Sequence, residues 1–156
     1  MAATMAQLQN AILLSTKAHY GQYDKAGAPY ILHPIRVMMR MPTIEGKIVA
    51  IGHDIIEDTP ITIADLVRED WPDECVYAID SMTKCKNEKY SDYLDRVISD
   101  PLASECKLED MRDNSNIYRL QKVAKHHLRM IAKYHKGATR ILKAYPEFAP
   151  RFTLIN

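Results

Sequence analysis

The stretch HDIIEDT, residues 53–59, contains the densest cluster of ionisable side chains in the sequence. Because residues four apart share one face of a helix, His53 is expected to lie over Glu57 and Asp54 over Asp58. The two isoleucines between them then turn toward the core. The sequence therefore predicts that four titratable groups converge at one end of a helix.

This arrangement favours a bound divalent metal, because three carboxylates stacked without a cation would repel one another and raise a pKa. An imidazole and a carboxylate, here His53 and Asp54, are ligands that suit manganese, iron or zinc. Further ligands must come from elsewhere, and the candidates are His33 and Asp110, the latter with Asn114 one helical turn later. Taken singly, each residue has a structural alternative, as a capping or core histidine or a helix-end charge.

The chemistry that such a cluster supports is hydrolysis. A metal with open coordination positions lowers the pKa of bound water and polarises a phosphoryl oxygen. A carboxylate beside it can orient that water or protonate the leaving group. Glu57 and Asp58 are placed for this task if His53 and Asp54 hold the metal.

Helical periodicity extends outward from this stretch in both directions. A loop is expected at residues 21–30, GQYDKAGAPY, because glycine and proline interrupt the pattern there. No alternating run of strand length flanked by hairpin turns occurs, so we predict an all-α fold, a compact helical bundle. The expected helices cover about Thr4–His19, 34–41, Ile44–Ile56, a short one from Thr62, 72–82, Tyr90–Ser99, Leu102–Asn114 and Leu120–Ala144.

Length and composition fit one globular domain over residues 1–156. The chain is 47% hydrophobic and 26% charged, and it has no apolar run long enough to cross a membrane. The N-terminus lacks the features of a secretory signal, so the cytoplasm is the expected location. Three cysteines without a CxxC pair argue against a disulfide framework or a thiolate zinc site.

The charge balance excludes a strong overall field. The chain has 21 basic and 20 acidic residues, a net charge of +1, so an anionic ligand must be held by local charges. The segment KVAKHHLRMIAKYHKGATRILK, residues 122–143, is basic. We expect a solvated outer face there, and nucleic acid is an unlikely partner because no exposed aromatic residues are interleaved with the charges.

Four motifs occur in order along the chain: AHYGQYDKAGAPYILHP at 18–34, HDIIEDT at 53–59, MTK at 82–84 and KLEDMRDN at 107–114. In this order and at these separations they resemble the hydrolase domain of RelA/SpoT proteins and the small alarmone hydrolases. The resemblance implies an HD-superfamily helical fold and a manganese-preferring site. It also implies removal of pyrophosphate from the ribose 3′ position of guanosine tetra- or pentaphosphate.

The same resemblance assigns roles to individual residues. The implied metal ligands are His33, His53, Asp54 and Asp110. The implied catalytic acidic pair is Glu57 and Asp58. Asn114 falls where the family asparagine contacts the nucleotide, and Lys25 matches the second basic residue of the family's loop.

The substrate contacts depart from the family pattern. Asp24 stands where alarmone hydrolases usually have an arginine that helps to hold the base. We expect Asp24 instead to accept hydrogen bonds from guanine or from the amino group of adenine. The family's basic pair before the last motif falls on Ser91-Asp92, so phosphate contacts are expected from Lys86, Lys89 and Arg96.

Three functions remain open on these residues. The first is an alarmone-type 3′-pyrophosphohydrolase with a small-molecule nucleotide as its partner. The second is an HD nucleotide phosphatase that acts on another nucleotide or a dinucleotide cofactor and releases orthophosphate. The third is a nucleotide-binding module without turnover, which would have no need of a water-activating metal flanked by two spare carboxylates.

Overall fold

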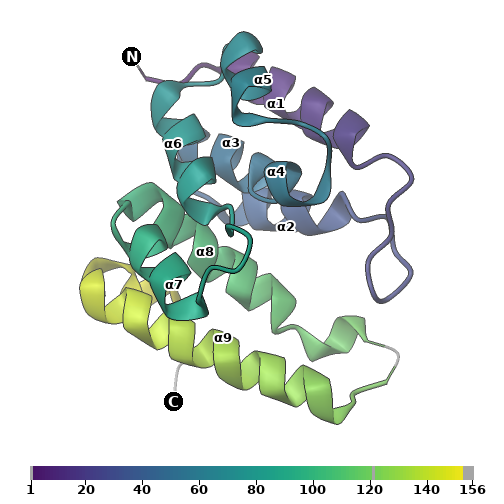
Figure 1. Cartoon of the computed structure of the whole chain (residues 1–156), viewed down its shortest axis with the longest axis vertical. Helices are drawn as coiled ribbons and strands as arrows, with labels where there is room; N and C mark the ends of the chain where they lie inside the picture. Colours follow the sequence, from purple (N-terminus) through teal and green to yellow (C-terminus); the bar gives the residue numbers. More distant parts are fainter. Residues whose placement is uncertain (1, 121, 153–156) are drawn as a thin grey trace.

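The computed structural model describes residues 2–120 and 122–152, which form helices joined by loops (Figure 1). The predicted all-α fold is confirmed for these residues, in which an isolated bridge between Tyr23 and Pro29 accompanies the helices. The helices are Met5–Ala18 (α1), Leu32–Arg40 (α2), Ile44–Gly52 (α3), Ile55–Asp58 (α4), Ile63–Arg68 (α5), Asp73–Met82 (α6), Tyr90–Ile98 (α7), Pro101–Asn114 (α8), the 3-10 turn Ile117–Arg119 (η1), Lys125–Ala144 (α9), the 3-10 turn Pro146–Phe148 (η2) and Ala149–Phe152 (α10).

Local sequence signals fix where several helices begin and end. The Thr4 side chain accepts from the Gln7 amide while the Gln7 side chain accepts from the Thr4 amide, so α1 begins in a capping box. The predicted box of Thr62 and Asp65 opens α5 in the same way. Gly21 follows α1 with a φ of +81°, a left-handed conformation that glycine adopts without steric cost. The predicted first helix and the loop after it are therefore confirmed.

α3 lies at the centre of the core, where it packs against α1, α2, α6 and α8. Residues 48–51 have no exposed surface, as expected of a helix that is apolar on all sides. Gly52 at its end lies against Trp71, and a Cβ added there would come within 2.6 Å of the indole ring. This close packing fixes the backbone immediately before His53.

The prediction of one continuous helix over Ile44–Ile56 is wrong at its C-terminal end, because α3 and α4 are separate helices. His53 and Asp54 form the turn between them. The Asp58 amide still donates to the Asp54 carbonyl at 3.0 Å, so the helical relation of these two residues is kept. The turn places His53 and Asp54 beside the core rather than on the outer face of a long helix.

α9 runs along α7 and α8 and packs against both (Figure 1). It begins at Lys125 rather than at Leu120, since the 3-10 turn η1 takes up part of the connection after α8. Gly137 permits this packing, because a Cβ there would lie 2.8 Å from the Met111 side chain and 2.9 Å from the Tyr90 hydroxyl. The lysines and arginines of α9 are exposed, as the prediction of a solvated face requires.

The cysteines play no covalent structural role. All three are free, with Cys75 and Cys106 buried and Cys85 exposed. Burial raises the pKa of the Cys75 thiol to about 12, so it stays protonated at neutral pH. In the described part of the chain, no helix combines the length and apolarity needed to span a bilayer.

Candidate active site

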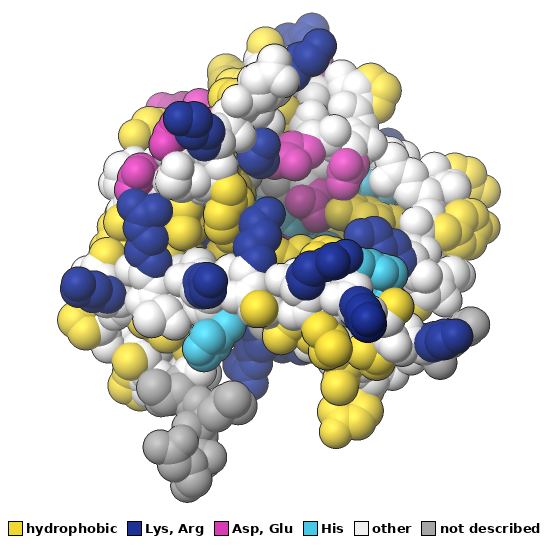
Figure 2. Space-filling view, turned by 60° about the horizontal axis from the view of Figure 1, so that its bottom comes forward, with side chains coloured by type: hydrophobic (Ala, Val, Ile, Leu, Met, Phe, Trp, Pro, Cys, Tyr) yellow, Lys and Arg dark blue, Asp and Glu magenta, His cyan; other side chains and the backbone are white. Residues whose placement is uncertain are grey.

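The face of the molecule that carries α9 is hollowed. Figure 2 shows Asp and Glu side chains gathered inside this hollow, with Lys and Arg side chains around it. Carboxylates and cations that share a recess are typical of a site where charged groups have a chemical task.

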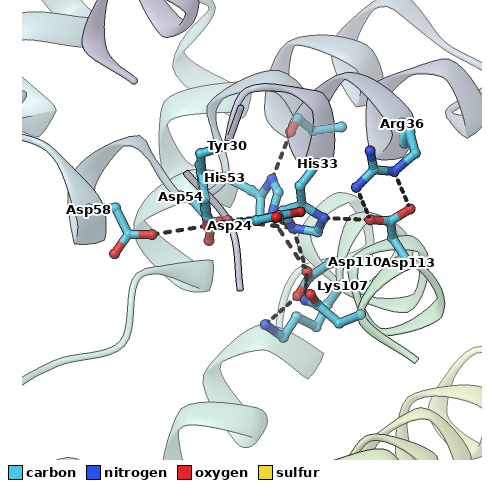
Figure 3. A network of polar contacts seen from close by, with 12 residues as sticks. Asp24, Tyr30, His33, Arg36, His53, Asp54, Asp58, Lys107, Asp110 and Asp113 are labelled. Atoms are coloured by element: carbon cyan, nitrogen blue, oxygen red, sulfur yellow. Dashed lines mark hydrogen bonds and ion pairs between the residues drawn. The ribbon is translucent and has the colours of Figure 1, made fainter. Parts of the chain in front are cut away.

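The structure brings the four predicted metal ligands together (Figure 3). His33 lies in the first turn of α2, His53 and Asp54 lie between α3 and α4, and Asp110 lies in α8. The Nε2 atom of His33 is 3.2 Å from Nε2 of His53 and 3.1 Å from Oδ1 of Asp110. Asp54 Oδ2 is 3.0 Å from His53 Nε2 and 3.6 Å from His33 Nε2. Ligand atoms of His33, His53 and Asp54 therefore all lie within 4.8 Å of one another, and Asp110 Oδ1 approaches the two ring nitrogens at 3.1 and 3.5 Å.

The outer nitrogen of each histidine is fixed by an acceptor. His53 Nδ1 lies 2.7 Å from the Ala50 carbonyl oxygen, which can only accept, so this nitrogen carries the proton. His33 Nδ1 donates in the same way to Asp113 Oδ2 at 2.8 Å. When the rings are neutral, both Nε2 atoms are free to coordinate a metal. Two such nitrogens with two carboxylate oxygens suit manganese, iron or zinc.

The electrostatics of the two rings agree with a cation site. Burial lowers the pKa of His53, but Asp54 and Asp110 more than reverse this effect and leave the pKa well above its usual value. Burial also lowers the pKa of His33, and Asp110 with Asp113 raises it above the usual value. Buried imidazoles that attract positive charge this strongly provide a place where a divalent metal can replace protons.

Asp113 is a functional residue that the sequence analysis missed. Its side chain has no exposed surface and orients His33. Arg36 donates to both of its oxygens, from Nε at 2.9 Å and from its terminal nitrogen at 3.0 Å. Arg119 donates at 2.5 Å, and Arg40 lies 3.4 Å away. Burial raises the pKa of Asp113, but the bonds from His33 and Arg36 hold it well below its usual range.

Asp110 is held from both sides. Lys107 Nζ lies 2.8 Å from its Oδ2, and the Asn114 amide lies 2.6 Å from its Oδ1. Asn114 therefore contacts a predicted metal ligand, in addition to facing the cavity described below. Spacings of three and four place Lys107, Asp110, Asp113 and Asn114 on one face of α8. That periodicity is the sequence signal from which the roles of Lys107 and Asp113 could have been found.

The predicted catalytic residue Asp58 lies beside the ligand cluster. The Tyr30 hydroxyl is 2.6 Å from Asp54 Oδ2 and 3.0 Å from Asp58 Oδ2, so it links a metal ligand with this second carboxylate (Figure 3). The Gln22 side chain donates to the Asp58 carbonyl at 2.8 Å. The loop after α1 thus holds the end of α4 in place.

The other predicted catalytic residue, Glu57, contacts the loop that follows α6. Its Oε1 accepts a hydrogen bond of 2.5 Å from the Lys84 amide. Burial raises the pKa of Glu57, and the negative charge of Asp54 adds to this effect although the Lys84 bond opposes it. A carboxyl group with a raised pKa can hold a proton and deliver it.

A cavity of about 380 Å³ adjoins the cluster. The predicted substrate contacts Asp24, Lys25 and Asn114 line it, together with His33 and Asp58. Much of the remaining wall is apolar and consists of Ile117, Leu120, Met130, Ile131 and Tyr134. A cavity of this volume, with polar groups at one part of its wall, is within the range of small-molecule sites.

Asp24 holds its own loop as well as facing the cavity. Its Oδ1 accepts from the amides of Ala26 and Ala28, each at 2.9 Å, and its Oδ2 accepts from Arg119 at 2.8 Å. The predicted contact of Asp24 with a purine stays a prediction, and Arg119 is the partner that the sequence did not indicate. Because Arg119 also lines the cavity, a guanidinium reaches the site from η1.

Three predicted phosphate contacts lie in α7 and in the loop before it. Arg96 donates to Glu88 at 2.8 Å and to the carbonyls of Asp80 and Thr83 at 2.6 and 2.8 Å, so it ties α7 to the preceding loop. Lys86 and Lys89 are exposed residues of that loop. The Arg96 guanidinium is therefore committed to Glu88 and to backbone carbonyls, whereas phosphate binding by Lys86 and Lys89 stays a prediction.

Comparison with known proteins agrees with this geometry. No family model matches the chain. A guanosine-3′,5′-bis(diphosphate) 3′-pyrophosphohydrolase of Borreliella burgdorferi is 35% identical over 78 residues, and one of Aquifex aeolicus is 28% identical over 120 residues. A solved structure is described as a metazoan orthologue of SpoT that hydrolyses ppGpp and plays a role in starvation responses. It matches with a TM-score of 0.73 at 18% identity, over 99% of this chain and 100% of that one.

The chain has the fold of a SpoT-type hydrolase domain. The two bacterial matches cover 47% and 69% of this chain but only 12% and 17% of those proteins, so the chain spans a small part of their length. The SpoT-type fold accounts for the arrangement found here, in which helices distant in the sequence bring histidines and carboxylates to one point.

Proposed function

We propose that the protein is a metal-dependent phosphohydrolase that removes pyrophosphate from the ribose 3′ position of an alarmone-type guanosine nucleotide. The observation that carries this proposal is the convergence of two histidines and two aspartates beside two further carboxylates and a cavity of nucleoside size. The names of the bacterial relatives and of the structural neighbour support ppGpp as the substrate.

When bound at the four ligands, a divalent metal supplies Lewis-acid activation of water and of a phosphoryl oxygen. The chain's own carboxylates supply the proton transfers. Asp58, held by Tyr30 and Gln22, accepts a proton from the attacking water. Glu57, whose pKa is raised, donates a proton to the departing ribose oxygen.

These transfers balance the reaction. The water oxygen forms a bond to phosphorus, and the bond between that phosphorus and the ribose oxygen breaks. The products are pyrophosphate and a nucleotide with a free 3′ hydroxyl group. The two carboxyl groups exchange protons with solvent before the next turnover.

Manganese is the proposed metal, since imidazole and carboxylate ligands together suit it. The proposed location is the cytoplasm, which the three free cysteines support because free thiols are typical of reducing compartments. We propose that residues 1–156 form a single hydrolase domain. One cluster of buried residues, with members from α1 to α9, supports this proposal.

A second candidate is a phosphatase that releases orthophosphate from another nucleotide or a dinucleotide cofactor. The ion pair of Asp24 and Arg119 favours it, because an acid stands in the loop where the family has an arginine and the guanidinium comes from η1 instead. A nucleotide-binding module without turnover is the third candidate. The two carboxylates beside the ligand cluster count against it, since binding alone does not need them.

A nucleotide screen in the presence of Mn²⁺, with products identified by mass, tests the proposal. We expect pyrophosphate from a guanosine nucleotide that carries a 3′-diphosphate, and no product when a chelator is present. Orthophosphate released from a different nucleotide would favour the phosphatase. Nucleotide binding without any product would favour the binding module.

A further inference from the structure

Three lysines from different elements lie close enough for their charges to interact. Lys84 lies in the loop after α6, Lys107 in α8 and Lys133 in α9. The Lys84 amide bonds to Glu57 at 2.5 Å, and Lys107 Nζ bonds to the metal ligand Asp110 at 2.8 Å. We call these three residues the lysine cluster. Lys84 and Lys107 belong to the MTK and KLEDMRDN motifs, but the sequence analysis assigned no role to any of the three.

A pair of tyrosines from α7 connects the cluster. The rings of Tyr90 and Tyr93 lie 6.0 Å apart between centroids. Lys133 Nζ lies 3.9 Å from the Tyr90 centroid, and Lys107 Nζ lies 5.4 Å from the Tyr93 centroid. Ammonium groups so close to aromatic rings are attracted by the electron-rich ring faces, which fix their positions.

The approach of α9 that brings Lys133 to this place depends on Gly137, one turn further along the helix. A Cβ at Gly137 would lie 2.9 Å from the Tyr90 hydroxyl, so a larger residue would have to displace the Tyr90 and Met111 side chains. The Tyr90 hydroxyl is buried and has no hydrogen-bond partner among the described residues. A polar group buried without a partner costs free energy unless a ligand or water satisfies it.

The positive charge of the cluster is not balanced within the described part of the chain. Lys107 has Asp110 as a partner, whereas Lys84 and Lys133 have no ion pair with a carboxylate there. Burial lowers the pKa of Lys133, and the charges of Lys107 and Lys84 lower it further. Gathering like charges in this way is unfavourable unless an anion is bound between them.

We propose that Lys84, Lys107 and Lys133 bind the outer phosphate of a pyrophosphoryl group whose inner phosphate lies at the four metal ligands. This inference rests on the proposed function and deepens it, because it selects a diphosphate over a monophosphate as the group that is removed. Figure 2 shows Lys and Arg side chains around the hollow that holds the carboxylates, so cations are available near the predicted metal ligands. Charge-assisted hydrogen bonds from three ammonium groups compensate the charge of a terminal phosphate.

The test measures binding rather than turnover, with Mn²⁺ present throughout. Inorganic pyrophosphate and orthophosphate are titrated by calorimetry into wild type, Lys133→Met, Lys133→Arg and Lys136→Met. Lys136 is a matched control, since it is an exposed lysine of the same helix and its replacement changes the net charge equally. Thermal unfolding of each variant checks that the fold is kept.

We expect wild type to bind pyrophosphate at least about tenfold more tightly than orthophosphate, as one extra hydrogen bond to a charged group allows. Lys133→Met should lose about tenfold in pyrophosphate affinity and little in orthophosphate affinity. Lys133→Arg should keep most of the pyrophosphate affinity, and Lys136→Met should equal wild type. Equal behaviour of the two methionine variants, or equal affinity of wild type for the two anions, would overturn the inference.

The same experiment separates this inference from the proposed function. If wild type hydrolyses no nucleotide but Lys133→Met still loses pyrophosphate binding, the inference stands and the function fails. If wild type releases pyrophosphate from a nucleotide and Lys133→Met binds the anion like wild type, the function stands and the inference fails.

Discussion

His33 and His53 face each other through their Nε2 atoms at a distance of 3.2 Å. Each ring donates its other nitrogen to a fixed acceptor, Asp113 in one case and the Ala50 carbonyl in the other. Neither ring can turn away without losing that bond, so the two lone pairs are aimed at the same point. The pair is therefore organised before any metal arrives.

Replacing Asp54 by Ala should abolish both Mn²⁺ binding and turnover, because it removes one of the four converging ligand atoms. Mn²⁺ at about 100 times its Kd should raise the free energy of unfolding of the wild-type protein by about 2.7 kcal/mol, because a ligand that binds only the folded state stabilises that state. Calorimetric titration and thermal unfolding measure the two effects. Asp92→Ala, at an exposed position of α7, is the control and should behave like wild type. Full stabilisation of Asp54→Ala by Mn²⁺ would exclude Asp54 as a ligand.

Glu57→Gln and Asp58→Asn should keep the fold and the metal but lose turnover by about 10²- to 10⁴-fold, the usual contribution of a general acid or base. Both changes preserve shape and remove an ionisable group. Steady-state kinetics give the loss, and circular dichroism with Mn²⁺ titration shows that the rest of the site is intact. Rates near wild type in both variants would leave these carboxylates with a structural role.

Asp113→Asn should destabilise the protein by about 1–3 kcal/mol, because it removes a buried carboxylate that accepts charge-assisted hydrogen bonds from partly exposed arginines. It should also weaken metal binding by about 10- to 100-fold, since His33 loses its orienting carboxylate. Denaturant unfolding without metal and Mn²⁺ titration measure these effects separately. An affinity for Mn²⁺ equal to that of wild type would mean that His33 is held by other contacts.

The stability of the metal-free protein should depend on pH through the same residue. The folded pKa of Asp113 is lowered, so its stabilising contribution is complete above its unfolded value of about 3.9 and is lost as the pH falls below it. Wild type should therefore lose stability more steeply than Asp113→Asn as the pH falls below about 4. Parallel unfolding curves for the two proteins across this range would contradict the assignment.

Lys25→Ala should raise the Michaelis constant for every nucleotide substrate, because Lys25 lines the cavity and offers a cation to phosphate.

Asp24→Arg should act differently, since it places a second guanidinium beside Arg119 and removes the acceptor of two loop amides. We expect it to change the ranking of purine substrates more than it changes Mn²⁺ affinity. An unchanged ranking would show that the Asp24–Arg119 pair does not influence the nucleoside.

The sequence predicted the metal site better than the surroundings of the substrate, and the reason is physical. His33, His53, Asp54 and Asp110 occur within recognisable motifs, so their roles could be inferred without knowing how the helices pack. Arg119 lies outside such motifs, and it reaches the cavity only through tertiary packing that periodicity does not reveal. Lys86, Lys89 and Arg96 were expected at the substrate because they are near in sequence, but the Arg96 guanidinium is bound to Glu88 instead.

The helix break before α4 was missed for a related reason. The apolar residues of 44–56 follow a helical pattern throughout, although Gly52, a residue type that often ends helices, stands immediately before the break. The turn at His53 and Asp54 is stabilised by tertiary contacts, among them the Trp71 ring packed on Gly52. Local propensity alone does not include such contacts.

The single face of α8 that carries Lys107, Asp110, Asp113 and Asn114 has a consequence for how this chain can vary in evolution. Deleting or inserting one residue at the start of α8 would rotate all four side chains by roughly 100° relative to the core. The predicted metal ligand Asp110, its partners Lys107 and Asn114, and the carboxylate that orients His33 would all leave the site through this one change. Length changes in functional descendants are therefore expected in connections distant from the site, such as the turn at Asp70 between α5 and α6, and not in α8.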